Sequence, residues 1–191
     1  MQQIREAIRA HPANVSYTER GIAPLFTASR RSKLVIIGQA PGSRAEASGI
    51  PWDDKSGETL REWLGVSDEQ FYDPDVISLL PMDFYFPGKG KTGDLPPRKD
   101  FAPLWHPQLL AEMPNIGLRI LIGAYAQAHY LGDRQERNLT ETVRSATSYL
   151  PDFFPIVHPS PLNFRWQKKN PWFAEEVLPR MRSLVAEVID R

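Results

Sequence analysis

The chain has 191 residues, of which 41% are hydrophobic and 24% charged, a composition that predicts one folded domain with a sizeable core and excludes a disordered chain. It contains no cysteine, which excludes disulfides, thiolate nucleophiles and cysteine-ligated zinc or iron–sulfur centres. The 23 basic residues are balanced by 23 acidic ones, so contact with nucleic acid would depend on a local basic patch.

Four short apolar runs predict buried β-strands, and they are rich in aliphatic and β-branched residues, as parallel strands covered on both faces should be. These runs are Lys33–Gly38, Val76–Leu80, Leu118–Gly123 and Phe154–Val157. Helices are expected between and around them, at Gln2–Ala10, Gly57–Gly65, Pro107–Met113, Ala124–Leu131 and Leu139–Ser145. A last helix is expected to be capped by Asn170, to begin at Pro171 and to break near Pro179.

Strands that alternate with helices predict a three-layer α/β/α fold with a central four-stranded parallel sheet, in a single domain spanning residues 1–191. In such sheets the binding site lies outside the carboxyl ends of the strands. That rule directs attention to the loops that follow Gly38, Leu80 and Val157.

The first of these loops reads Gly38-Gln39-Ala40-Pro41-Gly42. Two glycines and a proline form a tight turn whose backbone can approach a ligand closely. A glycine-rich turn after a strand is equally well explained as a simple turn. A phosphate-binding loop of the nucleotide-kinase type is excluded, because no Gly-Lys-Ser/Thr follows.

The loop after the fourth strand reads His158-Pro159-Ser160-Pro161-Leu162-Asn163. A single histidine after a strand is often only a structural hydrogen-bonding residue. A proline-framed loop, however, restricts the backbone and suits a side chain that must be placed in advance. The stretch from Phe153 to Ala174 contains no acidic residue. It therefore predicts a local basic patch formed by Arg165, Lys168 and Lys169.

Further residues follow the first loop in a recognisable order, namely Gly49, Pro51, Trp52, Ser56, Gly57 and Leu60. With the two loops, they resemble the uracil-DNA glycosylase superfamily, especially its thermophile-type branch, which reads G-E-A-P-G, then G-x-P-F, then A-G-x-L-L. The run from His158 to Asn163 resembles the H-P-S-P-L-S/N segment of the same superfamily. The resemblance implies a DNA-repair enzyme that flips a damaged base out of DNA and hydrolyses its glycosidic bond.

The resemblance also implies roles for individual residues. His158 and Gln39 stand at catalytic positions, His158 as a donor to the leaving base. Trp52 stands where an aromatic ring stacks on the extruded base, and Leu162 where an apolar wedge enters the duplex. The remaining base-binding positions are Gly38, Ala40, Pro41, Gly42 and Asp83. The remaining DNA-binding positions are Ser56, Ser160, Asn163, Arg165, Lys168 and Lys169.

The sequence departs from the family pattern where the attacking water is held. Many superfamily members place Asp or Asn at the position of Ala40, although the thermophile-type branch also has Ala there. Gln39 replaces that branch's Glu and cannot act as a general base. Asp53 and Asp54 follow Trp52, and either one contributes here or both are solvated loop charges. The branch's iron–sulfur cluster is not expected, because its four cysteines are absent.

The segment after the second strand lacks the Asn with which the superfamily often reads uracil. Asp83 is the best polar substitute, and a turn or capping aspartate is the alternative. The stretch Phe86–Arg98 has no core pattern and is expected to be a long loop that becomes ordered on binding.

We therefore expect a monofunctional glycosylase acting on uracil or another deaminated base in DNA. A catalytically weak or inactive DNA-binding relative is the alternative, and Leu162 argues against an enzyme of free nucleosides. The expected partner is DNA containing a damaged base, with no metal or other cofactor, and the expected state is a monomer. No apolar run is long enough to cross a bilayer and no secretory signal opens the chain, so we expect no membrane partner and a cytoplasmic location.

Overall fold

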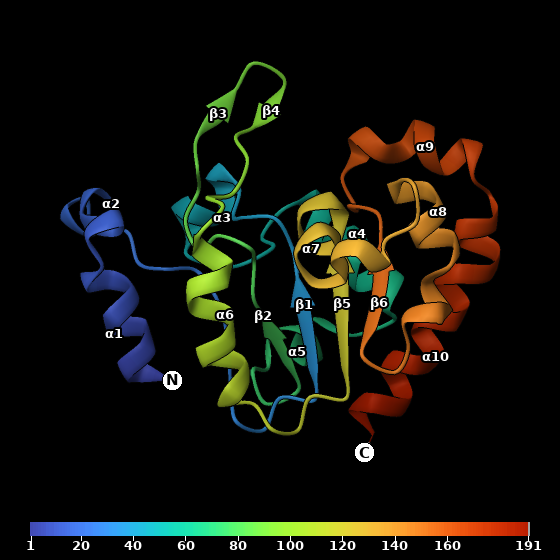
Figure 1. Ribbon diagram of the computed structural model, residues 1–191, viewed down its shortest axis with the longest axis horizontal. Coiled ribbons are helices and arrows are strands. Elements are labelled where there is room, and N and C mark those ends of the chain that lie inside the picture. The colour runs from blue at the N-terminus through green and yellow to red at the C-terminus, as the bar shows by residue number, and fades with distance from the viewer. Residues whose placement is uncertain (191) are drawn as a thin grey trace.

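The computed structural model describes residues 1–190, and a parallel sheet with strand order β2-β1-β5-β6 forms its centre (Figure 1). The strands are β1 Leu34–Ile37, β2 Ile77–Leu79, β5 Leu118–Ile122 and β6 Phe153–Ile156. In the register, Leu34 lies opposite both Ile77 and Leu118. The expected four-stranded parallel sheet is confirmed, and each predicted strand end lies within one residue of the observed end.

Helices cover both faces of the sheet (Figure 1). Leu34 and Ile36 of β1 face a core that also contains residues of α4, Lys55–Leu64, and α10, Leu178–Ile189. The alternate residues, Val35 and Ile37, face a second core that contains residues of α1 (Gln2–Ala10), α6 (Phe101–Ala111) and α7 (Gly123–Leu131). Successive side chains of a strand point to opposite faces, so a fully apolar strand needs a cover on each side. The three-layer α/β/α fold is therefore confirmed.

The other elements connect or extend these layers. The longer ones are α1 Gln2–Ala10, α6 Phe101–Ala111 and α7 Gly123–Leu131. The short helices are η1 Pro12–Asn14, α2 Val15–Glu19, α3 Ser43–Ser48, α5 Asp68–Tyr72, η2 Gly132–Arg134, α8 Leu139–Arg144, η3 Ala146–Tyr149, η4 Pro161–Asn163, α9 Phe164–Lys169 and the π-helical turn η5 Phe173–Val177. No helix within residues 1–190 is long and apolar enough to cross a membrane.

α4 begins at Lys55, two residues before the expected Gly57, and two other expectations about helix starts are wrong. The helix expected from Pro107 begins at Phe101, because Phe101 and Trp105 are buried in the core and hold the preceding turns in place. Asn170 does not cap the last helix, since its side chain donates to the carbonyl of Trp166 at the end of α9. The break expected near Pro179 is confirmed: η5 precedes it, and this proline lies in the first turn of α10.

The stretch Phe86–Arg98 is not a structureless loop. It contains a two-stranded antiparallel hairpin, β3 Lys89–Gly90 and β4 Gly93–Asp94, which projects from the body of the protein (Figure 1). Arg98 anchors the chain that leaves the hairpin: its Nη1 donates to the carbonyl of Ala13, at 3.0 Å, and to Oδ1 of Asn14, at 2.7 Å. The hairpin rises at the same end of the sheet as α9 (Figure 1).

Candidate active site

A cavity of about 180 Å³ lies where the loops after β1, β2 and β6 converge at the carboxyl ends of their strands. Its lining includes Gly38, Gln39, Ala40, Pro41, Gly42, Trp52, Asp54, Ser56, Pro81, Asp94, His158 and Ser160. The sheet order explains this convergence, because parallel strands end at one edge and present their following loops together. The three loops to which the sequence directed attention thus share one cavity.

His158 is held by its own loop. The backbone N–H of Ser160 donates to Nδ1 of His158 at 3.2 Å, and the Asn163 side-chain amide donates to the carbonyl of His158 at 2.8 Å. Because Nδ1 is an acceptor, the proton of the neutral ring lies on Nε2. Burial lowers the pKa of His158, an effect that the charges of Asp54 and Asp94 oppose. The imidazole is therefore a neutral donor at neutral pH, with its Nε2–H available to a ligand.

Trp52 forms an aromatic wall of the cavity in a strained backbone conformation, with φ at 58°. Two glycines make room for it. A Cβ at Gly57 would lie 1.8 Å from the carbonyl oxygen of Trp52, and one at Gly38 would lie 2.8 Å from Cζ2 of the indole. The Trp52 and His158 ring centroids are 5.7 Å apart and the planes are inclined by 31°. Gly38 and Gly57 thus fix the wall beside the donor.

Asp54 and Gln39 are engaged in holding the scaffold. Oδ1 of Asp54 accepts from the backbone N–H of Gly57 at 2.9 Å and caps the N-terminus of α4. The Gln39 side-chain amide donates to the carbonyl of Leu95 at 3.3 Å, which ties the loop after β1 to the hairpin. Asp53 lies 3.8 Å from Arg44 in a surface ion pair.

The assignment of Asp83 to the base pocket is corrected by the structure. Asp83 is completely buried and does not line the cavity. Its carboxylate accepts two hydrogen bonds from the Arg98 guanidinium, at 2.7 and 2.8 Å, and one from the backbone N–H of Tyr85 at 3.1 Å. Of the alternatives open for Asp83, the structural one holds, because the hydrogen bonds of its carboxylate go to Tyr85 and Arg98.

Asp94 is a cavity residue that the sequence analysis did not identify. It ends β4 and lines both the cavity and a neighbouring hollow of about 330 Å³, which extends from His158 to Leu162. Its hairpin carries no apolar periodicity, so no sequence pattern placed this carboxylate near the loop after β1. Only the docking of the hairpin brings it there.

Two exposed apolar residues, Leu162 and Phe164, follow His158 and form an apolar tip, and the basic helix α9 begins at the second of them. The Leu162 side chain is 85% exposed, and Phe164, which the sequence analysis missed, is 67% exposed. Arg165, Lys168 and Lys169 are exposed along α9. The structure places α9 and the hairpin at the same end of the molecule (Figure 1).

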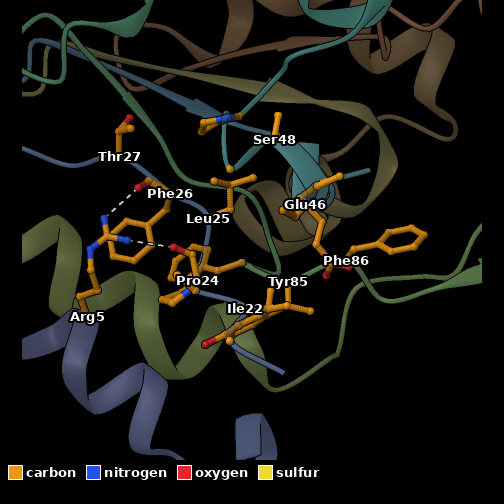
Figure 2. A pocket seen from close by; sticks show the side chains of 17 residues that line it. Arg5, Ile22, Pro24, Leu25, Phe26, Thr27, Glu46, Ser48, Tyr85 and Phe86 are labelled. Atoms are coloured by element: carbon orange, nitrogen blue, oxygen red, sulfur yellow. Dashed lines mark hydrogen bonds between the residues drawn. The ribbon is translucent and has the colours of Figure 1, made fainter. Parts of the chain in front are cut away.

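A larger cavity, of about 440 Å³, has Pro41 and Pro51 in its lining together with the residues that Figure 2 labels. Figure 2 shows the Arg5 guanidinium in its wall, donating to the carbonyls of Pro24 and Phe26 at 2.8 and 2.9 Å. Neither His158 nor Trp52 lines this cavity. The smaller cavity, which contains both, is therefore the candidate active site.

The site thus combines a parallel α/β sheet with a neutral histidine donor opposite an aromatic wall, and an exposed apolar tip and a basic helix follow the histidine loop. The model of the Uracil DNA glycosylase superfamily matches residues 25–182, a range that contains the whole sheet and all the cavity-lining loops. The chain belongs to this superfamily, which confirms the resemblance seen in its two loops.

Proposed function

We propose that the protein is a monofunctional DNA glycosylase that hydrolyses the N-glycosidic bond of uracil or another deaminated base flipped out of DNA. The observation that carries this proposal is the fixed tautomer of His158. Its Nδ1 accepts from the Ser160 N–H, and its Nε2–H is available in the cavity that Trp52 walls. A planar base stacked on Trp52 would have a neutral donor at its edge.

The chemistry needs such a donor. When the bond between C1′ and the base nitrogen breaks, the electron pair goes to the base, and negative charge gathers on its carbonyl oxygen. A preplaced N–H directed at that oxygen stabilises the charge as it develops, and removal of one such donor typically costs about 100- to 1,000-fold in rate. His158 is suited to this role because a neutral imidazole donates the hydrogen bond without having to give up its proton.

Base extrusion is the second requirement, since the target must leave the helical stack at a cost of a few kcal/mol. Leu162 is exposed and lines the neighbouring hollow that extends from His158, and it is suited to fill the space that the flipped base leaves. Arg165, Lys168 and Lys169 on the adjoining α9 are suited to contact phosphates on either side.

The test is cleavage of oligonucleotides that contain uracil, hypoxanthine or xanthine, single-stranded and opposite each normal base. We expect a strand break after alkali at one or more of these bases, and a loss of about 100- to 1,000-fold in the single-turnover rate for His158→Ala. Activity should persist in EDTA, since no group of three His, Asp or Glu within residues 1–190 is placed to hold a metal ion. Undiminished cleavage by His158→Ala would contradict the proposal.

The alternative is a catalytically weak or inactive relative that binds DNA and keeps the base pocket. Ala40 favours it, because many superfamily members hold the attacking water with Asp or Asn at this position. The same oligonucleotides separate the two functions. Tight, salt-dependent binding of a lesion with no cleavage under single-turnover conditions would identify the alternative.

A further inference from the structure

Hydrolysis is faster when a side chain takes the proton of the attacking water, and the side chains of the loop after β1 offer no such base. Ala40 has no polar side chain, and the Gln39 amide donates to Leu95 and cannot accept a proton. The candidate active site has two carboxylates in its lining, those of Asp54 and Asp94. One of these two must supply the base if the water is activated by the protein.

Asp54 is held in place by its structural role. Its Oδ1 caps α4 through the backbone N–H of Gly57, the same residue whose missing side chain makes room for Trp52. Movement of Asp54 toward a water would open the first turn of α4. Its carboxylate is therefore part of the frame that supports the aromatic wall.

Asp94, in contrast to Asp54, is bound to a lysine side chain and faces the loop after β1. Its Oδ1 accepts from Lys89 Nζ at 2.6 Å, and the two residues lie opposite each other in the hairpin. Its Oδ2 is directed toward the loop after β1, 3.9 Å from the point where a Cβ of Gly42 would lie. The side chain is 31% exposed, so a water molecule can reach it. The Asp94 charge also opposes the lowering of the His158 pKa, so carboxylate and imidazole share one electrostatic environment.

The hairpin that carries Asp94 is docked by residues of the first loop. The Gln39 amide donates to the carbonyl of Leu95, and the Leu95 N–H donates to the carbonyl of Gly88 at 2.9 Å, which closes the base of the hairpin. A glutamate at position 39 would present only acceptors to the Leu95 carbonyl. The glutamine is thus matched to the hairpin, and its partner is the residue that follows Asp94.

We propose that Asp94 supplies from the hairpin the carboxylate that the loop after β1 lacks, and that Gln39 is the positioning residue that docks it. The assignment rests on the proposed function. Oδ2 of Asp94 accepts a proton from the water as the water oxygen bonds to C1′. The bond from C1′ to the base breaks, its electron pair leaves with the base, and the base oxygen accepts from Nε2–H of His158. The proton on Asp94 then passes to the released base or to solvent.

Asp94→Asn tests the proton transfer, because the amide keeps the size of the side chain and cannot take a proton. We expect the single-turnover rate on the best substrate to fall about 100-fold or more, the usual contribution of a general base. Affinity for an uncleavable abasic-site analogue should stay within about twofold. The control is Lys89→Met, which removes the same ion pair and keeps the carboxylate, with an expected loss below about 10-fold.

Equal losses in Asp94→Asn and Lys89→Met would overturn the assignment, since the ion pair alone would then explain them. Cleavage by the unaltered protein that Asp94→Asn leaves intact would overturn the assignment and leave the proposed function standing. No cleavage of any substrate by the unaltered protein would overturn both.

Gln39→Leu tests the positioning role separately. Loss of the amide donor should raise amide hydrogen exchange in residues 88–95 and lower the cleavage rate. The Gln39→Leu/Asp94→Asn double variant should be no slower than Asp94→Asn alone, because both changes act through one carboxylate. If the rate losses of the two single variants multiply in the double variant, or if amide hydrogen exchange in residues 88–95 is unchanged in Gln39→Leu, Gln39 does not dock Asp94.

Discussion

The pKa of the buried His106 lies well below the ordinary value for histidine. Its ring is completely enclosed, with Nε2 3.0 Å from the Pro81 carbonyl and Nδ1 2.7 Å from the Tyr130 hydroxyl. A neutral imidazole satisfies both contacts, Nε2–H donating and Nδ1 accepting. Burial therefore lowers the pKa of His106 to about 4, and the hydrogen bond to Pro81 offsets only part of that change. The residue is a scaffold histidine, in contrast to His158.

This pKa predicts how stability depends on pH. The unfolded chain takes up a proton near the ordinary value of about 6.5, but the folded chain does so only near 4. Stability is therefore fully present above pH 6.5 and is lost as the pH falls toward 4, by roughly 3 kcal/mol for this group. Urea unfolding between pH 7.5 and 4 should show the decline, and His106→Gln should show a shallower one. A decline of equal steepness in the variant would assign the effect to other groups.

At the scale of elements, the first turn of α4 and the turn that contains Trp52 form one unit. Asp54 caps the helix, Gly57 lies against the Trp52 carbonyl, and Tyr72 from α5 donates to the same carbonyl at 3.5 Å. These contacts hold Trp52 in a conformation that a non-glycine residue rarely adopts. The aromatic wall is thus a product of helix packing as well as of its own sequence.

Gly57→Ala should damage this unit, although alanine at a helix position ordinarily stabilises by about 1 kcal/mol. The added Cβ would lie 1.8 Å from the Trp52 carbonyl oxygen, so the segment that carries the indole must shift. We expect a lower unfolding midpoint and a loss of cleavage of about 10-fold or more, since small misplacements at a site are costly. The matched control is Gly117→Ala, whose Cβ would make an ordinary 3.4 Å contact with Val188. Equal effects in both variants would refute a specific clash.

At the scale of the whole molecule, charge is neutral in total and uneven in distribution. The 23 basic and 23 acidic residues cancel. Yet α9 carries exposed Arg165, Lys168 and Lys169, and no acidic residue lies between Phe153 and Ala174. This basic helix begins at the exposed Phe164 and follows the exposed Leu162, and α9 lies at the same end of the protein as the hairpin (Figure 1).

DNA binding should therefore weaken steeply with salt, with a slope of about −0.9 per phosphate contact in a plot of log affinity against log salt. Lys168→Glu/Lys169→Glu should lower affinity for all sequences alike and make that slope shallower by about two contacts. Arg30→Glu/Arg31→Glu is the control, because it makes the same change in net charge just before the amino end of β1, where exposed ion pairs contribute little. Unchanged affinity in the α9 variant would show that DNA contacts another face.

The sequence by itself determined the features that are encoded by neighbouring residues. Apolar runs such as Lys33–Gly38 fixed the strands, since a fully buried strand must be apolar on both faces. The motifs in the loops after β1 and β6 identified the superfamily, and the rule for parallel sheets placed the site at these loops. Both features depend on residues close together in the chain.

The tertiary structure alone decided the features that depend on residues far apart. Asp83 is a scaffold residue because Arg98, from beyond the hairpin, reaches its carboxylate and also Asn14, 84 positions away in the chain. Asp94 lies in the cavity because Gln39, 56 positions from Leu95, docks the hairpin. Such polar contacts leave no periodic pattern in the sequence, because each involves one residue on each segment. The long-range contacts of the folded chain therefore decide that Asp83 belongs to the scaffold and that Asp94 lines the candidate active site.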